Sequence, residues 1–175
     1  MPLSRRQLNL AGFAVCAALL GFALFVQHGL GVAPCNMCIL QRIAVGALGL
    51  ALLAAAVHDP ADGGARLYGA LIALTGLVGA ALSARHVWMQ MQPAGSLPSC
   101  GADFYTLLGM LPPWEVVTKI LRGGGDCQAI GWSLFGISMP GWLLLAVTVI
   151  SLAGVVANFS PTGVPAAARS RRAAG

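Results

Sequence analysis

Charged side chains are scarce in this chain: they make up 9% of its 175 residues, whereas hydrophobic residues make up 58%. A soluble domain usually carries about a quarter charged residues, so this composition argues against a water-facing globule. Residues 8–26 and 139–159 contain no charge at all. Because no charged residue lies at mid-bilayer depth in any long apolar stretch, a transporter is disfavoured as well.

Four apolar stretches approach the roughly 20 residues that a helix needs to cross a bilayer. Arg42 lies in the first turn of the second stretch, and Arg85 lies near the last turn of the third. The pattern predicts an all-α, polytopic membrane protein, an antiparallel bundle of four transmembrane helices that forms a single domain over residues 1–175. The four predicted spans are residues 8–26, 39–57, 67–88 and 139–159.

The net charge of +5 does not indicate nucleic-acid binding, because the basic residues flank the spans and form no stripe on one helix face. With an even number of spans, the two termini and the middle connection share one side of the membrane. The positive-inside rule makes that side cytoplasmic. We therefore expect the loops at residues 27–38 and 89–138 to face outward, away from the cytoplasm. The basic residues on the cytoplasmic side are Arg5, Arg6, Arg66, Arg169, Arg171 and Arg172.

The N-terminal segment resembles a targeting signal, because Arg5 and Arg6 precede the first apolar run. That run of about 19 residues is longer than the usual signal-peptide core of 7–15 residues. Cleavage would also leave three spans and reverse the topology of the remaining basic flanks. We therefore predict an uncleaved membrane anchor, with a cleaved signal peptide as the alternative.

The second outer loop contains a short amphipathic pattern that begins at Pro112-Pro113. Proline is compatible with the first turn of a helix. Trp114, Val117 and Leu121 recur at helical spacing, so we predict a short helix that lies on the membrane surface. A loop helix packed on the bundle is the alternative. The glycines at residues 123–125 then predict a hinge before Cys127.

Five cysteines are present, and four of them lie outside the predicted spans. Cys16 is in the middle of the first span, where it is expected to be a small apolar filler. Cys35 and Cys38 form a tight Cys-x-x-Cys pair, whereas Cys100 and Cys127 are separated by a long polar loop. Two structural disulfides are one possible interpretation. A Cys-x-x-Cys bridge closes a very short loop and adds little chain-entropy stabilisation, so this spacing is more typical of disulfides that are made and broken.

Two other uses of these cysteines are disfavoured. A four-thiolate zinc site usually shows two closely spaced pairs, and the second pair here is 27 residues apart. A c-type haem requires histidine directly after the second cysteine, and Ile39 stands there. We therefore expect no metal.

Arg42 follows Cys38 by four residues and so lies one turn further along the same helix face. An arginine at the apolar edge of a bilayer usually faces a partner or a cavity, although snorkelling to the interface is the alternative. We favour a role in stabilising a Cys38 thiolate or polarising a carbonyl of a bound ligand. Arg85 and His86 end the third span and can face the same place, or His86 can be an ordinary interfacial residue.

These residues together resemble the bacterial disulfide bond formation protein B (DsbB) family. Its Cys-x-x-Cys-x-x-x-Arg signature matches Cys35-Asn-Met-Cys38-Ile-Leu-Gln-Arg42. The match continues through Ala84-Arg85-His86, Cys100, Gly125-Asp126-Cys127 and Met139-Pro140-Gly141-Trp142, in the same order over nearly the whole chain. Gln41 stands where the family often has an acid.

The resemblance implies a quinone reductase of the inner membrane that reoxidises DsbA, a soluble periplasmic thiol oxidase with a thioredoxin fold. It implies that the reduced partner attacks Cys100 and that Cys127 helps to resolve the resulting mixed disulfide. It also implies that a transient Cys35–Cys127 bond then passes electrons to the Cys35–Cys38 pair. Cys38 then faces the quinone, with Arg42 near the ring and His86 favoured over Arg85 as the second contact. Ubiquinone is favoured over menaquinone.

Two other functions stay open at this point. A vitamin K epoxide reductase type of enzyme would carry its active dithiol on a later helix. A non-enzymatic membrane scaffold with two structural disulfides predicts that loss of Cys35 or Cys38 changes stability but not thiol oxidation elsewhere.

Overall fold

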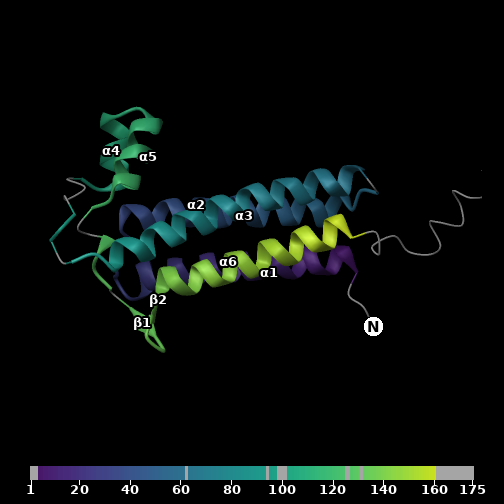
Figure 1. The fold of residues 1–175 in the computed structure, drawn as a ribbon, viewed down its shortest axis with the longest axis horizontal. Coiled ribbons are helices and arrows are strands. Elements are labelled where there is room, and N and C mark those ends of the chain that lie inside the picture. Colours follow the sequence, from purple (N-terminus) through teal and green to yellow (C-terminus); the bar gives the residue numbers. More distant parts are fainter. Residues whose placement is uncertain are drawn as a thin grey trace, which may run out of the picture.

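Four long helices dominate the computed structural model of the chain, and they confirm the predicted all-α membrane bundle (Figure 1). Each contains an 18-residue stretch whose mean hydropathy lies between 1.8 and 2.2, and each is long enough to cross a bilayer. They are α1 (Arg5–Gly29), α2 (Asn36–His58), α3 (Gly63–Gln90) and α6 (Met139–Phe159), and each contains its predicted span. The structure describes residues 4–61, 63–93, 95–97, 102–124, 127–130 and 132–160.

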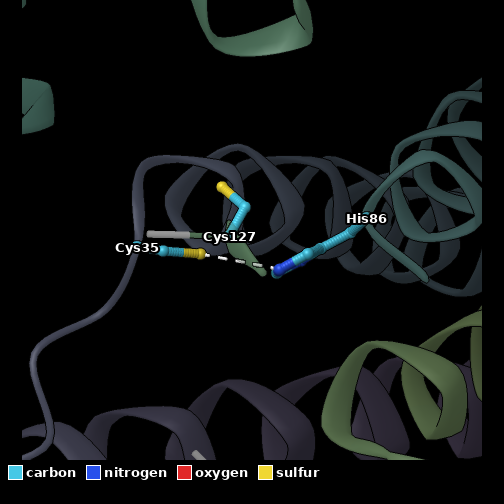
Figure 2. A group of neighbouring side chains, drawn as sticks. All are labelled: Cys35, His86 and Cys127. Carbon is cyan, nitrogen blue, oxygen red and sulfur yellow. Dashed lines mark hydrogen bonds between the residues drawn. The ribbon is translucent and has the colours of Figure 1, made fainter. Parts of the chain in front are cut away.

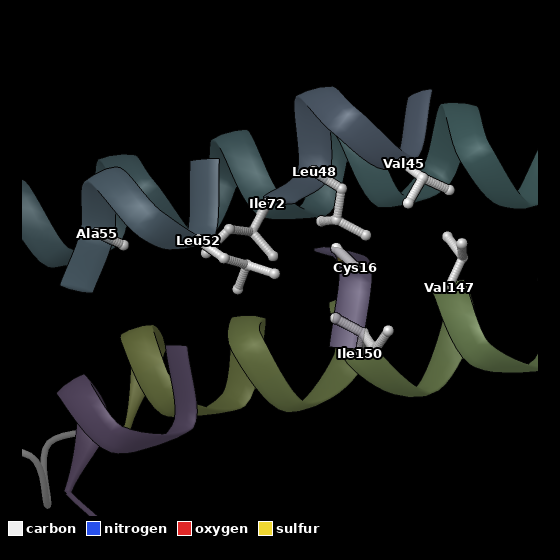
Figure 3. Packing of buried hydrophobic residues seen from close by; sticks show 8 residues of the cluster. All are labelled: Cys16, Val45, Leu48, Leu52, Ala55, Ile72, Val147 and Ile150. Carbon is white, nitrogen blue, oxygen red and sulfur yellow. The ribbon is translucent and has the colours of Figure 1, made fainter. Parts of the chain in front are cut away.

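The helices form a closed ring in which α1 packs on α2, α2 on α3, α3 on α6, and α6 back on α1. Buried side chains from all four helices meet in the centre of the bundle (Figure 3). Cys16 is 1% exposed within this core, as expected for an apolar filler. Large apolar side chains such as Leu50 and Leu77 point outward and are more than 60% exposed, which suits a bundle surrounded by lipid.

Glycines let α3 and α6 approach closely. A Cβ atom placed on Gly76 would lie 2.3 Å from the Cβ atom of Ser151, and one on Gly69 would lie 2.6 Å from the ring of Phe159. Lipid supplies no hydrophobic force between membrane helices, so close packing of small residues holds them together. Gly69 and Gly76 therefore serve the close packing of α3 on α6.

The connections at one end of the bundle carry four short elements (Figure 1). The predicted helix after Pro112 is present as α5, and its first residue is a proline, as the sequence indicated. A second short helix and a hairpin were not predicted, because elements of two to seven residues leave little periodic signal. These elements are α4 (Phe104–Met110), α5 (Pro113–Arg122), β1 (Ser133–Leu134) and β2 (Ile137–Ser138).

Helices α4 and α5 pack on the outer ends of α2 and α3 and form a second apolar cluster with them. From α5, Val116 and Ile120 are fully buried in this cluster, whereas Trp114 is 69% exposed and Val117 is 38% exposed. The helix therefore packs on the bundle through one face and presents apolar side chains on another. Contact of that second face with the membrane surface stays a prediction.

The predicted glycine hinge is packed against the bundle at its start. Gly123 ends α5 with φ of +102°, a backbone conformation that side chains other than glycine rarely adopt. A Cβ atom there would lie 2.8 Å from the sulfur of Met89. Both Gly123 and Gly124 are buried, and Gly125 lies outside the described residues. The backbone N–H of Cys127 then donates to the carbonyl of Gly124 at 2.9 Å, which fixes Cys127 close to the end of α5.

Candidate active site at the outer end of the bundle

Cys35 and Cys38 occupy the start of α2, where the chain turns into the membrane helix. Cys35 is the N-cap residue, and its sulfur accepts a hydrogen bond from the backbone N–H of Cys38 at 3.2 Å. The thiol of Cys35 in turn donates to the sulfur of Cys38, and the two Sγ atoms are 2.8 Å apart. Both cysteines are free thiols here. Because the sulfurs already touch, only a small movement separates them from disulfide geometry once an oxidant removes two electrons and two protons.

His86 reaches the same sulfur from α3. Its Nε2 atom lies 3.8 Å from the Sγ atom of Cys35, and the side chain is only 2% exposed. The other ring nitrogen, Nδ1, lies 3.2 Å from Oε1 of Gln41 on α2. Gln41 donates through Nε2 to the hydroxyl of Ser83 at 3.2 Å, so its carbonyl oxygen faces the histidine. Gln41 Oε1 is thus the acceptor available to Nδ1, and Nε2 faces the sulfur of Cys35.

Cys127 completes a compact group with Cys35 and His86 (Figure 2). The two sulfurs and a ring nitrogen of His86 all lie within 4.8 Å of one another. Cys127 is fully buried because it belongs to the cluster formed by α2, α3, α4 and α5. Helix packing thus brings together a residue of the tight cysteine pair and a residue of the loop pair.

The surroundings of Cys35 keep its thiol protonated. Its hydrogen bond with Cys127 is the largest cause, followed by its hydrogen bond with Cys38 and by burial, and together they raise the pKa of Cys35 far above its usual range. A protonated thiol is a poor nucleophile. In the reduced state Cys35 is therefore a proton donor to its neighbours.

Arg42 extends from α2 toward α1. Its guanidinium donates to the side-chain oxygen of Gln27 and, at 3.0 Å, to the backbone carbonyl of Ala23. These two acceptors hold the positive charge at a fixed place within the apolar part of the bundle. The guanidinium therefore has partners inside the bundle, and its predicted role toward Cys38 or a bound ligand stays a prediction.

A cavity of about 480 Å³ opens beside these groups, a volume typical of small-molecule sites. Most of its lining is apolar and comes from α1, α2, α6 and the segments next to them. The side chains that bring polar or redox-active atoms to it include Cys35, Cys38, Gln41, Arg42 and His86. An apolar ligand with one or two polar oxygens matches such a lining.

Arg85 does not take part in this site. It donates to the carbonyls of Leu121 and Arg122 at 3.1 and 3.3 Å, and its guanidinium lies 4.1 Å from the ring centre of Trp88. A cation at the last carbonyls of a helix is favourable, so Arg85 fastens the C-terminal end of α5 to α3. Of the two adjacent candidates, His86 is the one next to the cysteines.

Cys100 and the tail residues Arg169, Arg171 and Arg172 lie outside the described residues. The predicted role of Cys100 and its pairing with Cys127 therefore stay predictions. Three residues that the geometry connects to the site were not predicted: Gln27, Gln41 as the partner of His86, and Ser83. Their common signal is polarity inside a membrane span, which is rare unless the side chain has a partner there.

Known proteins with a similar sequence identify the family of this chain. The family model described as "Disulfide bond formation protein DsbB" matches residues 5–157. The chain is 45% identical to disulfide bond formation protein B of Azoarcus sp. (strain BH72) over 145 residues, which cover 83% of this chain and 87% of the relative. It is 43% identical to the protein of the same name from Chromobacterium violaceum over 156 residues, which cover 89% and 91%. The chain therefore belongs to the DsbB family and is a membrane-spanning, disulfide-forming oxidoreductase.

Proposed function

We propose that this protein reoxidises a periplasmic DsbA-like thiol oxidase and passes the electrons, through two cysteine pairs, to a quinone in the bacterial inner membrane. The observation that carries the proposal is the position of Cys35. Its sulfur lies within 4.8 Å of Cys127 on one side, and it lines an apolar cavity with Cys38 and Arg42 on the other.

The first exchange takes place between the partner and the loop pair. A thiolate of the reduced partner attacks Cys100 of a Cys100–Cys127 disulfide, which breaks that bond and releases Cys127. The second partner thiol then attacks the mixed disulfide and releases Cys100. The partner leaves with one new disulfide, and the loop pair holds two electrons and two protons.

The second exchange links the loop pair to the tight pair. The Cys127 thiolate attacks Cys35 of the Cys35–Cys38 disulfide, forms a Cys35–Cys127 bond and releases Cys38. Cys100 then attacks Cys127, which restores the loop disulfide and leaves Cys35 and Cys38 reduced. The closeness of Cys35 and Cys127 supports this step, because exchange needs direct access of one sulfur to another.

The tight pair must then lose two electrons and two protons to become a disulfide again. A bound quinone supplies that oxidising power. Cys38, near the positive N-terminus of α2, is the thiol proposed to face the ring, and Arg42 and His86 would hold its carbonyl oxygens. His86 Nε2 is also placed to accept the proton that Cys35 gives up.

The mostly apolar lining and the volume of the cavity suit a quinone ring that enters from lipid. Because Arg5 and Arg66 lie at the opposite end of the bundle from Cys35, the positive-inside rule supports a periplasmic site. Ubiquinone is the proposed substrate, ahead of menaquinone.

A free-thiol count tests this function. Purified, fully reduced protein is mixed with a soluble ubiquinone analogue under argon, and thiols are counted before and after. We expect the wild type to lose four of its five thiols and a Cys38→Ser variant to fail to do so. A Cys16→Ser variant is the matched control and should also lose four, because Cys16 is buried in the bundle core.

The opposite result identifies the alternative. If the wild type keeps all its thiols and the quinone stays oxidised, the protein is not a quinone-dependent enzyme. A membrane scaffold with two structural disulfides would then be the better account.

A further inference from the structure

Three side chains with strong metal-binding atoms meet at the outer end of the bundle, although they lie far apart in the sequence. Cys35, His86 and Cys127 come from the start of α2, from α3 and from the segment after α5 (Figure 2). The spacing of the cysteines alone disfavours a zinc site, because it considers only thiolates. Tertiary packing instead brings a histidine to one cysteine of each pair.

We propose that the reduced protein binds one thiophilic divalent cation, Zn²⁺, through Cys35, Cys127 and His86. Two thiolate sulfurs and one imidazole nitrogen form a donor set typical of zinc and unsuited to magnesium or calcium. No carboxylate belongs to this group within the described part of the chain. The inference goes beyond the proposed function, because binding needs neither a quinone nor a protein partner.

The distances fit a tetrahedral zinc ion. Zinc lies about 2.3 Å from sulfur and about 2.0–2.1 Å from nitrogen, so neighbouring tetrahedral ligand atoms stand about 3.5–3.8 Å apart. The sulfur of Cys35 and Nε2 of His86 are already 3.8 Å apart. The widest separation in the group does not exceed 4.8 Å, so a contraction of about 1 Å closes the site.

The histidine is held in the orientation that a ligand needs. Oε1 of Gln41 lies 3.2 Å from Nδ1 and the amide is itself fixed by Ser83, while Nε2 faces the sulfur of Cys35. Metal-binding histidines nearly always donate their second nitrogen to such an acceptor, which fixes the tautomer and the ring plane. This second contact points to a ligand role independently of the closeness of the three atoms.

Charge also favours the ion in this buried place. Binding converts two thiols to thiolates and releases two protons, so the two negative charges neutralise Zn²⁺ and the site carries no net charge. A neutral complex costs little in an apolar surrounding. The fourth position is left for water or for Cys38, whose sulfur is 2.8 Å from that of Cys35.

Bound zinc would occupy one cysteine of each pair and keep both reduced. Disulfide formation at Cys35 then requires loss of the metal. The site would thus make the reduced state of the protein sensitive to free zinc.

Cobalt spectroscopy tests the site without any enzymatic readout. The background is a Cys38→Ser/Cys100→Ser double variant in detergent, reduced, freed of reductant and kept anaerobic. It retains Cys35, Cys127 and the core residue Cys16, so neither native pair can form. Titration with Co²⁺ should give thiolate charge-transfer and tetrahedral d–d bands that saturate at one ion per chain. One equivalent of Zn²⁺ should abolish them and release two protons per ion.

Single changes within this background assign the ligands. Cys127→Ser removes one of the two thiolates and should therefore cut the charge-transfer band by half or more, and His86→Gln should weaken Co²⁺ binding about tenfold or more. Cys16→Ser should leave both band intensity and affinity unchanged. Circular dichroism confirms that each variant keeps its helices, and because Cys127→Ser is nearly isosteric, it tests the site even if His86→Gln fails to fold.

Absence of Co²⁺ bands, or bands unchanged by Cys127→Ser, would overturn the proposal. The background lacks Cys38 and is inactive in the proposed quinone reaction. Failure of metal binding there leaves the proposed function standing, and failure of the thiol-count experiment leaves the metal site standing.

Discussion

Gln41 holds His86 in place from the neighbouring helix, with Oε1 of the glutamine 3.2 Å from Nδ1 of the histidine. A neutral amide makes this contact. The amide is fixed in turn by Ser83, so two residues, one on each of two helices, orient the imidazole toward Cys35.

Replacing Gln41 by leucine should therefore act through His86. The ring loses its acceptor, and a buried N–H group without a partner costs about 1–3 kcal/mol. We expect quinone-driven thiol oxidation to slow by about fivefold to tenfold at neutral pH and its pH profile to change shape, because the tautomer of His86 is no longer fixed. Rates measured across pH test this, with Ser83→Ala as the milder companion. An unchanged pH profile with a lower melting temperature would show a purely structural role.

Replacing Arg42 by lysine should weaken the binding of quinone. The guanidinium donates to both Gln27 and the carbonyl of Ala23, and an ammonium group cannot reproduce that planar geometry. In Arg42→Lys we expect the KM for a soluble quinone to rise about tenfold, which matches the loss of one charge-assisted hydrogen bond. Steady-state kinetics test this, with Arg66→Lys at the other end of the bundle as the control. Equal KM values in the two variants would contradict a binding role for Arg42.

Alanine at Gly76 should destabilise the bundle. The added Cβ atom would lie 2.3 Å from the Cβ atom of Ser151, so α3 and α6 must separate. Overpacking of this kind costs about 1–3 kcal/mol. Thermal unfolding in detergent should show a lower Tm for Gly76→Ala. Gly21→Ala is the matched control, because nothing lies within 4 Å of its new Cβ atom, and its Tm should not fall. A similar Tm for both variants would mean that the two helices do not pack this closely.

Alkylation of Cys35 should require an unusually high pH. The hydrogen bond with Cys127, that with Cys38 and burial all raise the pKa of Cys35, so its thiol persists at pH values where an ordinary cysteine, with a pKa of about 8.5, is already a thiolate. Site-resolved mass spectrometry after iodoacetamide treatment of reduced protein measures the midpoint. The Cys127→Ala variant lacks the hydrogen bond that raises the pKa of Cys35 most, so the midpoint pH for alkylation of Cys35 should be lower in it. A midpoint near the ordinary value in the wild type would contradict the observed contacts.

The four spans could be predicted because each depends on about 20 consecutive apolar residues, which is a local property. The position of Arg42 on the same helix face as Cys38 could be predicted equally well, because helical periodicity puts residues four apart on one face. Pro112-Pro113 likewise marked the start of α5. The residues that carry the DsbB resemblance lie within these patterns or in short loop motifs such as Gly125-Asp126-Cys127, which is why the family could be identified before any contact was known.

Tertiary packing decided the rest. His86 is 51 positions from Cys35, and which of Arg85 and His86 faces the site depends on the rotation of α3 about its own axis. That rotation is set by close contacts such as those of Gly76 with α6, and hydropathy carries no information about it. The closeness of Cys127 to Cys35 depends in the same way on how α4 and α5 pack on α2 and α3. The sequence by itself determined the membrane bundle and its reactive cysteines, whereas the partners of those cysteines follow from long-range side-chain packing, which no local pattern encodes.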